Sequence, residues 1–175
     1  LMLASHNKDI KLIKTVSILC ALLVPLLVTG PFLPDLLLSS LVIWFIYYTI
    51  KQKFFKFYQN IYFYIFISFC IFCIISSILS DSVLVSLKSS IFYFRIGIFA
   101  LLISFLISQY KKILDYFYFS LVLTFSILIV DGYYQYFNGF NLIGMPIKDF
   151  RISSFFGDEL VMGSYLSRLF PLLFA

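Results

Sequence analysis

Residues 61–79 read IYFYIFISFCIFCIISSIL, an apolar run without a single charged side chain. A helix needs about 20 such residues to cross the hydrocarbon core of a bilayer, because each residue advances it by about 1.5 Å. This run therefore predicts a transmembrane helix. Five more runs share its character and together predict an all-α, polytopic transmembrane bundle of about six helices. The six apolar runs fall at 12–30, 36–50, 61–79, 91–107, 114–130 and 159–175.

The composition argues against a soluble domain and supports a membrane protein. Of the 175 residues, 62% are hydrophobic and 12% are charged, whereas soluble domains carry about 25% charged residues. A soluble fold of this length would need more polar groups to cover its surface. Cys20, Cys70 and Cys73 all lie in apolar runs, and the C-x-x-C spacing of the last two has no second ligand pair. We expect packing cysteines, with no disulfide and no metal or other cofactor.

The basic residues alternate between the two sides of the predicted helices. Loops on one side hold eight lysines, whereas the loops on the other side hold six acidic residues and three Lys or Arg. Because cytoplasmic loops carry the excess of positive charge, the N-terminus is predicted to be cytoplasmic, in an inner (cytoplasmic) membrane. The net charge of +5 is thus a topology signal, and no nucleic-acid partner is expected. The lysine-rich loops carry Lys8, Lys11, Lys14, Lys51, Lys53, Lys56, Lys111 and Lys112.

Three segments follow from these assignments. Residues 1–130 are predicted to form five N-terminal transmembrane helices with short loops, 131–158 a periplasmic loop, and 159–175 the start of a sixth helix. Pro25 predicts a kink in the first helix, because proline lacks the N–H that the helix needs. The chain begins with Leu1 and stops within an apolar run. We therefore expect the N-terminal half of a larger bundle of about twelve helices.

All three arginines lie in the outer half of this topology, whereas the cytoplasmic loops use lysine alone. Arg151 falls in the outside loop, and Arg95 one or two turns inside the outer end of the fourth helix. If the sixth helix begins at Asp158, with that carboxylate as its N-cap, Arg168 lies roughly 15 Å along the axis. A cation at that depth is costly unless it faces a polar cavity or a partner.

Guanidinium groups suit phosphate recognition, because their planar fork donates two hydrogen bonds where lysine offers a point charge. We therefore expect Arg151, Arg168 and Arg95 to line an outward-facing pocket for a phosphate or pyrophosphate headgroup. Two alternatives stay open: the clustering is due to chance, or Arg95 makes a structural salt bridge or extends toward the membrane surface.

The outside loop and the helix after it also carry a family resemblance. They read DGYYQYFNGFNLIG from Asp131 to Gly144 and RISSFFGDELVMGSYLSRLFP from Arg151 to Pro171. The spacing of their aspartate, glutamine, glycine and arginine residues resembles that of the bacterial O-antigen ligase and polymerase superfamily. The match is most specific over residues 131–171, and elsewhere it rests on topology.

The resemblance implies a membrane glycosyltransferase of the O-antigen ligase type. Such an enzyme transfers a glycan from a polyprenyl-diphosphate donor to the lipid A core or another saccharide acceptor, on the periplasmic face of the membrane. Arg151 matches the loop arginine that would hold the donor diphosphate and stabilise transition-state charge. Arg168 and Arg95 are looser matches for substrate-binding residues.

The resemblance also implies supporting roles for Gln135, Asp158 and Glu159. The two acids could replace a general base, although a helix N-cap and a partner for Arg151 are sufficient explanations for them. The family's histidine, from a later periplasmic loop, has no counterpart here, because the one histidine is His6 in the cytoplasmic tail. We therefore expect the fragment alone to be inactive.

Three alternatives remain from the sequence. A polysaccharide polymerase of the same superfamily would use the same chemistry. An anion or solute transporter would use the arginines to bind its substrate, but such proteins often contain inverted repeats, and no convincing internal repeat is present. A structural or assembly subunit is the third possibility. The glycines concentrate in the outside loop, which favours the enzyme.

Overall fold

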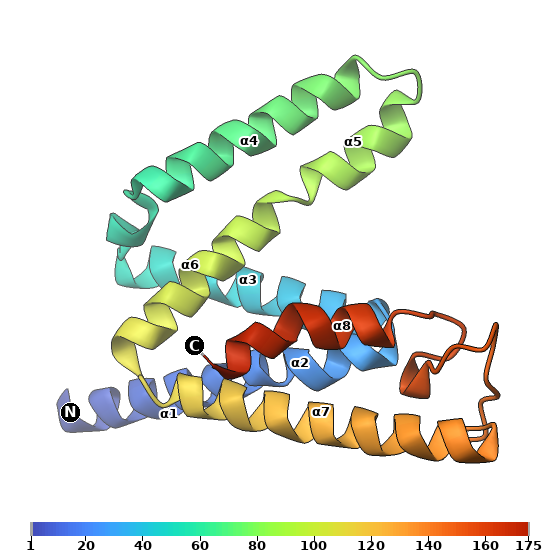
Figure 1. Ribbon diagram of the computed structural model, residues 1–175. Helices are drawn as coiled ribbons and strands as arrows, with labels where there is room; N and C mark the ends of the chain where they lie inside the picture. The colour runs from blue at the N-terminus through green and yellow to red at the C-terminus, as the bar shows by residue number, and fades with distance from the viewer. Residues whose placement is uncertain (1, 175) are drawn as a thin grey trace. The chain divides into compact units, whose positions relative to one another are not determined.

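The computed structural model describes the backbone of residues 2–174 and the side chains of residues 10–56 and 58–174. Within residues 2–174 all regular elements are helical, and two isolated bridges are the nearest approach to a strand (Figure 1). The expected all-α fold is confirmed. The elements are α1 (Met2–Ala21), α2 (Leu23–Leu26), η1 (Leu27–Thr29), α3 (Phe32–Gln52), η2 (Phe55–Tyr58), α4 (Ile61–Ile78), α5 (Val83–Ile91), α6 (Phe94–Gln109), α7 (Ile113–Asn138), η3 (Ser154–Phe156), α8 (Met162–Leu169) and η4 (Phe170–Leu173).

Five helical segments of the described chain are long and apolar enough to cross a membrane. They coincide with the first five predicted spans, so the chain is a multi-pass membrane protein. Their exposed surfaces are rich in Ile, Leu and Phe, as lipid contact requires. The five segments are Ile10–Thr29, Phe32–Gln52, Ile61–Ile78, Val83–Gln109 and Ile113–Asn138.

The sixth predicted helix starts later than expected. The helix α8 begins at Met162 with Val161 at its N-cap position, so the expectation that Asp158 begins and caps this helix is wrong. The Asp158 carboxylate instead pairs with the ammonium of Lys148, 2.5 Å away. Arg168 consequently lies six residues after Met162, roughly 9 Å along α8.

The chain divides into two compact units, Leu1–Leu37 with Tyr110–Ala175, and Leu38–Gln109. In the first unit the long helix α7 runs beside α1 and α2, and α8 packs against it as well (Figure 1). One buried cluster joins Val24 of α2 to Leu121 and Phe125 of α7, with Tyr165 of α8 packed against it. Apolar contact therefore holds α8 to this unit.

Pro25 interrupts the first predicted span, as expected. The helix α1 ends at Ala21, and a short α2 and the 3-10 turn η1 follow. Since Pro25 has no N–H to donate to the Ala21 carbonyl, that carbonyl needs another donor. The Ser120 hydroxyl on α7 supplies it at 2.8 Å. The break is thus satisfied from a neighbouring helix, as membrane helices require.

The second unit contains an α4–α5 hairpin whose facing positions are serines. The hydroxyls of Ser77 and Ser90 lie 2.5 Å apart, and those of Ser80 and Ser86 lie 2.9 Å apart. Within the same unit α6 packs on α4 at Gly97, where an added Cβ would lie 2.2 Å from the Phe66 ring. Gly97 therefore permits the close approach of these two helices.

Arg95 lies farther from the start of its apolar segment than predicted. The span that contains it begins at Val83 and not near residue 91, and it is interrupted at Phe92 and Tyr93 between α5 and α6. Arg95 thus lies near the middle of a 27-residue segment, roughly 18 Å from Val83. The expectation that it lies close to the outer end of this helix is wrong, because the short α5 extends the helix toward its N-terminus.

The Gly97–Phe66 contact predicts a stability effect. Gly97→Ala should destabilise the α4–α6 packing by roughly 1–3 kcal/mol, because the new methyl group displaces the Phe66 ring. Thermal unfolding in detergent micelles measures the effect. Gly163→Ala is the matched control, since an added Cβ there meets open space. Equal melting temperatures for both variants would contradict this packing.

Candidate functional site

The C-terminal end of α7 carries two fully buried polar side chains, Asp131 and Gln135. They lie four residues apart, so they share one face of the helix, and segment 139–161 folds back onto that face. The helix α7 continues to Asn138, where Gly139 ends it with a positive φ of 79°. The predicted loop start at residue 131 is therefore wrong by two helical turns.

The Gln135 side chain joins two distant parts of the loop. Its Oε1 accepts hydrogen bonds from the backbone N–H groups of Ser153 and Ser154, at 3.1 and 2.8 Å. Its Nε2 donates to the carbonyl of Met145 at 3.3 Å. Buried backbone groups need hydrogen-bond partners. In this loop, the Gln135 side-chain amide supplies them to Met145, Ser153 and Ser154.

Asp131 and Asn141 complete this arrangement. The Asp131 carboxylate accepts the Leu142 N–H at 2.9 Å and the Ser154 hydroxyl at 2.5 Å. Asn141, which is 1% exposed, accepts the Met145 N–H at 2.8 Å and donates to the Ser154 carbonyl at 2.7 Å. We call Asp131, Gln135, Asn141 and Ser154 the loop clamp.

The loop clamp gives Gln135 a role that the sequence did not reveal. We expected it to support the site, and it supports the loop by hydrogen bonding. Ser154 adopts a positive φ of 50°, which is uncommon for a residue with a side chain and is held by the clamp. The sequence signal for this cluster was available in part, since Asp131, Gln135 and Asn141 are polar residues that directly follow an apolar run.

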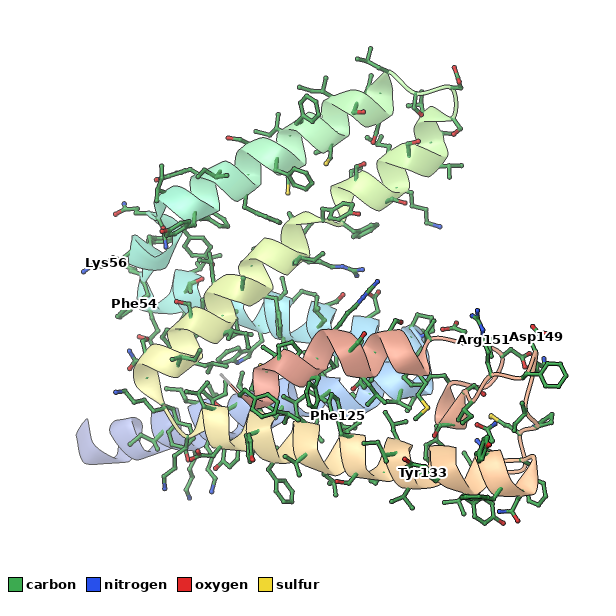
Figure 2. The ribbon with its side chains drawn as sticks, viewed as in Figure 1. Phe54, Lys56, Phe125, Tyr133, Asp149 and Arg151 are labelled. Carbon is green, nitrogen blue, oxygen red and sulfur yellow. The ribbon has the colours of Figure 1, made fainter. Side chains whose placement is uncertain are left out.

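Arg151 is the last residue of a tight hairpin, Lys148 to Arg151, in the middle of the loop. The Arg151 N–H donates to the Lys148 carbonyl at 2.8 Å. Its guanidinium is exposed, and within the described residues it has no hydrogen bond or ion pair. Figure 2 shows Arg151 and Asp149 together at the same end of this unit as the C-terminus of α7. A pairing of Asp158 with Arg151, one of the explanations offered for the two acids, is not formed, and the Asp158 carboxylate pairs with Lys148.

Arg168 lines a cavity of about 420 Å³ in the first unit. We call it the Arg168 cavity. Its walls are mostly apolar, and its polar side chains are Arg168, Glu159, Ser164 and Tyr165. The cavity lies between α8, the segment that precedes it, and the turn after α2. Its lining comprises Leu27, Gly30, Pro31, Pro34, Phe156, Glu159, Val161, Ser164, Tyr165, Arg168 and Leu169.

Tyr165 fixes one wall of this cavity. Its hydroxyl donates to the Val24 carbonyl at 2.7 Å, and its ring packs on those of Phe125 and Phe156 at centroid distances of 6.2 and 5.3 Å. Arg168 follows Tyr165 by three residues and therefore lies on nearly the same face of α8. The tyrosine thus orients the helix face that carries the guanidinium.

Within the first unit, Arg151 and Arg168 do not line the same cavity. Arg151 is not among the described residues that line the Arg168 cavity. Arg95 belongs to the other unit, where its guanidinium donates to the Ser39 hydroxyl at 3.2 Å and lies 5.8 Å from the centre of the Phe92 ring. Of the predicted site arginines, Arg168 is the one that lines this cavity.

The Arg168 cavity combines apolar walls with one guanidinium and one carboxylate. A hydrocarbon chain fits the walls, and an anionic oxygen fits the guanidinium, because arginine donates in a planar fork. The described residues include no group of three or more His, Cys, Asp or Glu placed to bind a metal ion. The arrangement suits an amphiphile with an anionic head.

No family model, curated protein or solved structure matches this chain.

The loop clamp predicts how the loop responds to mutation. Gln135→Leu should loosen segment 139–161, because the buried Ser153 and Ser154 N–H groups lose their acceptor at a cost of roughly 1–3 kcal/mol each. Limited proteolysis in lipid nanodiscs should then cut within this segment faster than in the parent protein.

Asn138→Ala is the matched control for Gln135→Leu. The Asn138 amide lies on the same helix but bonds only the exposed Tyr134 carbonyl, so its loss should leave the cutting rate unchanged. Equal cutting rates for the two variants would contradict the loop clamp.

Proposed function

We propose that this chain belongs to a membrane glycosyltransferase of the O-antigen ligase type. The enzyme would transfer a glycan from a polyprenyl-diphosphate donor to a saccharide acceptor such as the lipid A core. In this proposal the chain lies in a bacterial inner membrane, with its lysine-rich loops in the cytoplasm and segment 139–161 on the periplasmic face. Polymerisation of a polysaccharide from the same donors is the related alternative.

The Arg168 cavity is the observation that supports the proposal most. A polyprenyl-diphosphate donor is a long hydrocarbon with an anionic head, and the cavity presents apolar walls beside a guanidinium. Both features occur in a multi-pass membrane protein, where a lipid-linked substrate is delivered through the bilayer. A soluble nucleotide-sugar donor would not need those walls.

The chemistry needs charge stabilisation more than proton transfer. The acceptor hydroxyl oxygen attacks the anomeric carbon, and the bond from that carbon to the diphosphate oxygen breaks. The polyprenyl diphosphate leaves with the bonding electron pair, and the hydroxyl proton passes to a base. Fixed cations in a site of low dielectric stabilise the negative charge that grows on the departing diphosphate. We assign this role to Arg168.

Glu159 is the candidate base within the described chain. It lines the same cavity as Arg168, and a carboxylate can accept the proton of the attacking hydroxyl. Asp158 is a weaker candidate, because it forms the ion pair with Lys148. The side chain of His6 lies outside the described residues.

Substitution of Arg168 tests the proposal. In the complete protein, Arg168→Lys should insert and fold normally but reduce glycan transfer by about 100-fold, because it keeps the charge and loses the two-donor fork. Transfer is measured in proteoliposomes from a radiolabelled polyprenyl-diphosphate glycan to the lipid A core.

Ser167→Ala is the matched control on α8, since Ser167 is exposed and bonds only the Ser164 carbonyl. Its transfer rate should equal that of the parent. Full transfer by Arg168→Lys would show that the Arg168 cavity does not bind the donor. Normal transfer combined with lost uptake of an anionic solute would instead favour a transporter.

A further inference from the structure

The hairpin that carries Arg151 has an aromatic residue at its tip in an unfavourable backbone conformation. Asp149 and Phe150 are its two central residues, with φ values of 49° and 56°. Two-residue hairpins of this kind favour Asn-Gly or Asp-Gly, because both central positions need positive φ. Aspartate tolerates that region, whereas a bulky aromatic residue there is an outlier. Such strain concentrates at functional sites.

Phe150 is fully exposed, with a relative accessibility of 103%. An aromatic ring gains nothing from folding in that position, so its contribution to packing cannot explain it. The flanks of the hairpin are nevertheless well fixed. Ile147 donates to the Gly139 carbonyl at 3.0 Å on one side, and the Ser153 N–H bonds Gln135 on the other. The loop clamp therefore presents the ring on a preorganised support.

Opposite charges flank the exposed ring. Asp149 precedes Phe150 and Arg151 follows it, and both side chains are exposed. The next cation, Lys148, is neutralised by the Asp158 carboxylate at 2.5 Å. The tip thus offers an apolar ring face, a hydrogen-bond acceptor and a forked donor, and its formal charge is zero.

We propose that the Asp149–Phe150–Arg151 tip binds a sugar ring of a glycan chain. A pyranose has an apolar face of C–H groups, which stacks on an aromatic ring, and a rim of hydroxyls, which both donate and accept. Asp149 accepts from those hydroxyls and Arg151 donates to them. The proposal rests on the proposed function only in taking a glycan as ligand, and it requires neither a diphosphate nor transfer.

The charge of the tip favours a sugar over insertion of Phe150 into the bilayer. Peripheral anchors combine apolar groups with a basic excess that attracts anionic lipids, and this tip has no net charge.

Binding to phosphate-free glycans tests this proposal separately from the proposed function. The complete protein in nanodiscs of phosphatidylethanolamine and phosphatidylglycerol is applied to an array of bacterial envelope oligosaccharides without lipid or phosphate. We expect binding to at least one glycan class. Phe150→Ala should weaken that binding about tenfold, the scale of one aromatic contact, whereas Phe150→Tyr should retain it.

Phe137→Ala is the matched control, because Phe137 is an exposed aromatic on α7 outside the tip. Its binding should equal that of the parent. Absence of binding to every arrayed glycan, or equal binding by Phe150→Ala, would overturn the proposal. These outcomes say nothing against Arg168, whose test depends on the diphosphate.

The membrane alternative has its own readout. A Trp44→Phe, Phe150→Trp double variant carries one indole, since Trp44 is the chain's one tryptophan. We expect its emission to respond to the bound oligosaccharide and to resist quenching by lipids with nitroxide-labelled acyl chains. Quenching by those lipids without a glycan response would overturn the proposal and identify a membrane anchor.

Discussion

Backbone N–H and C=O groups of a loop need partners once the loop folds against a helix, and in this chain side chains of α7 supply them. The carboxylate of Asp131 and the amide of Gln135 lie one turn apart and bind backbone groups at Leu142, Met145, Ser153 and Ser154. Because both side chains are fully buried, each lost contact leaves an unsatisfied polar group in a place without water. These hydrogen bonds consequently hold the loop in one conformation.

This constraint determines where the charged groups of the loop lie. The hairpin at residues 148–151 projects from two anchored flanks, and Ile152, Phe155 and Phe156 pack against the cluster of Val28, Leu128 and Met162. That cluster and the Tyr165–Val24 hydrogen bond position α8, and with it Arg168. A cation near a membrane is costly to place without a partner, and in our proposal the ligand of the Arg168 cavity supplies that partner.

The sequence predicted the elements better than their interactions. Apolar runs such as residues 61–79 identified five spans, because lipid imposes a length and a composition on each of them, and Pro25 marked the break after α1. The short α5 was missed, since serines and Lys88 dilute its apolar character. Asp131 and Gln135 were taken as loop residues because no periodicity shows that the chain returns to cover them. The Arg168 cavity depends on a contact between Tyr165 and Val24, which are 141 residues apart, and local pattern carries no information on such pairs.

Hydrogen exchange of the loop amides, measured by mass spectrometry in nanodiscs, tests most directly whether α7 preorganises this segment. Slow exchange is predicted at Leu142, Met145, Ser153 and Ser154, whose N–H groups bond buried side-chain oxygens, with fast exchange at the exposed Phe150 between them. Uniformly fast exchange across residues 139–161 would show a loop without fixed partners. That result would contradict the loop clamp and the support it gives to both arginines.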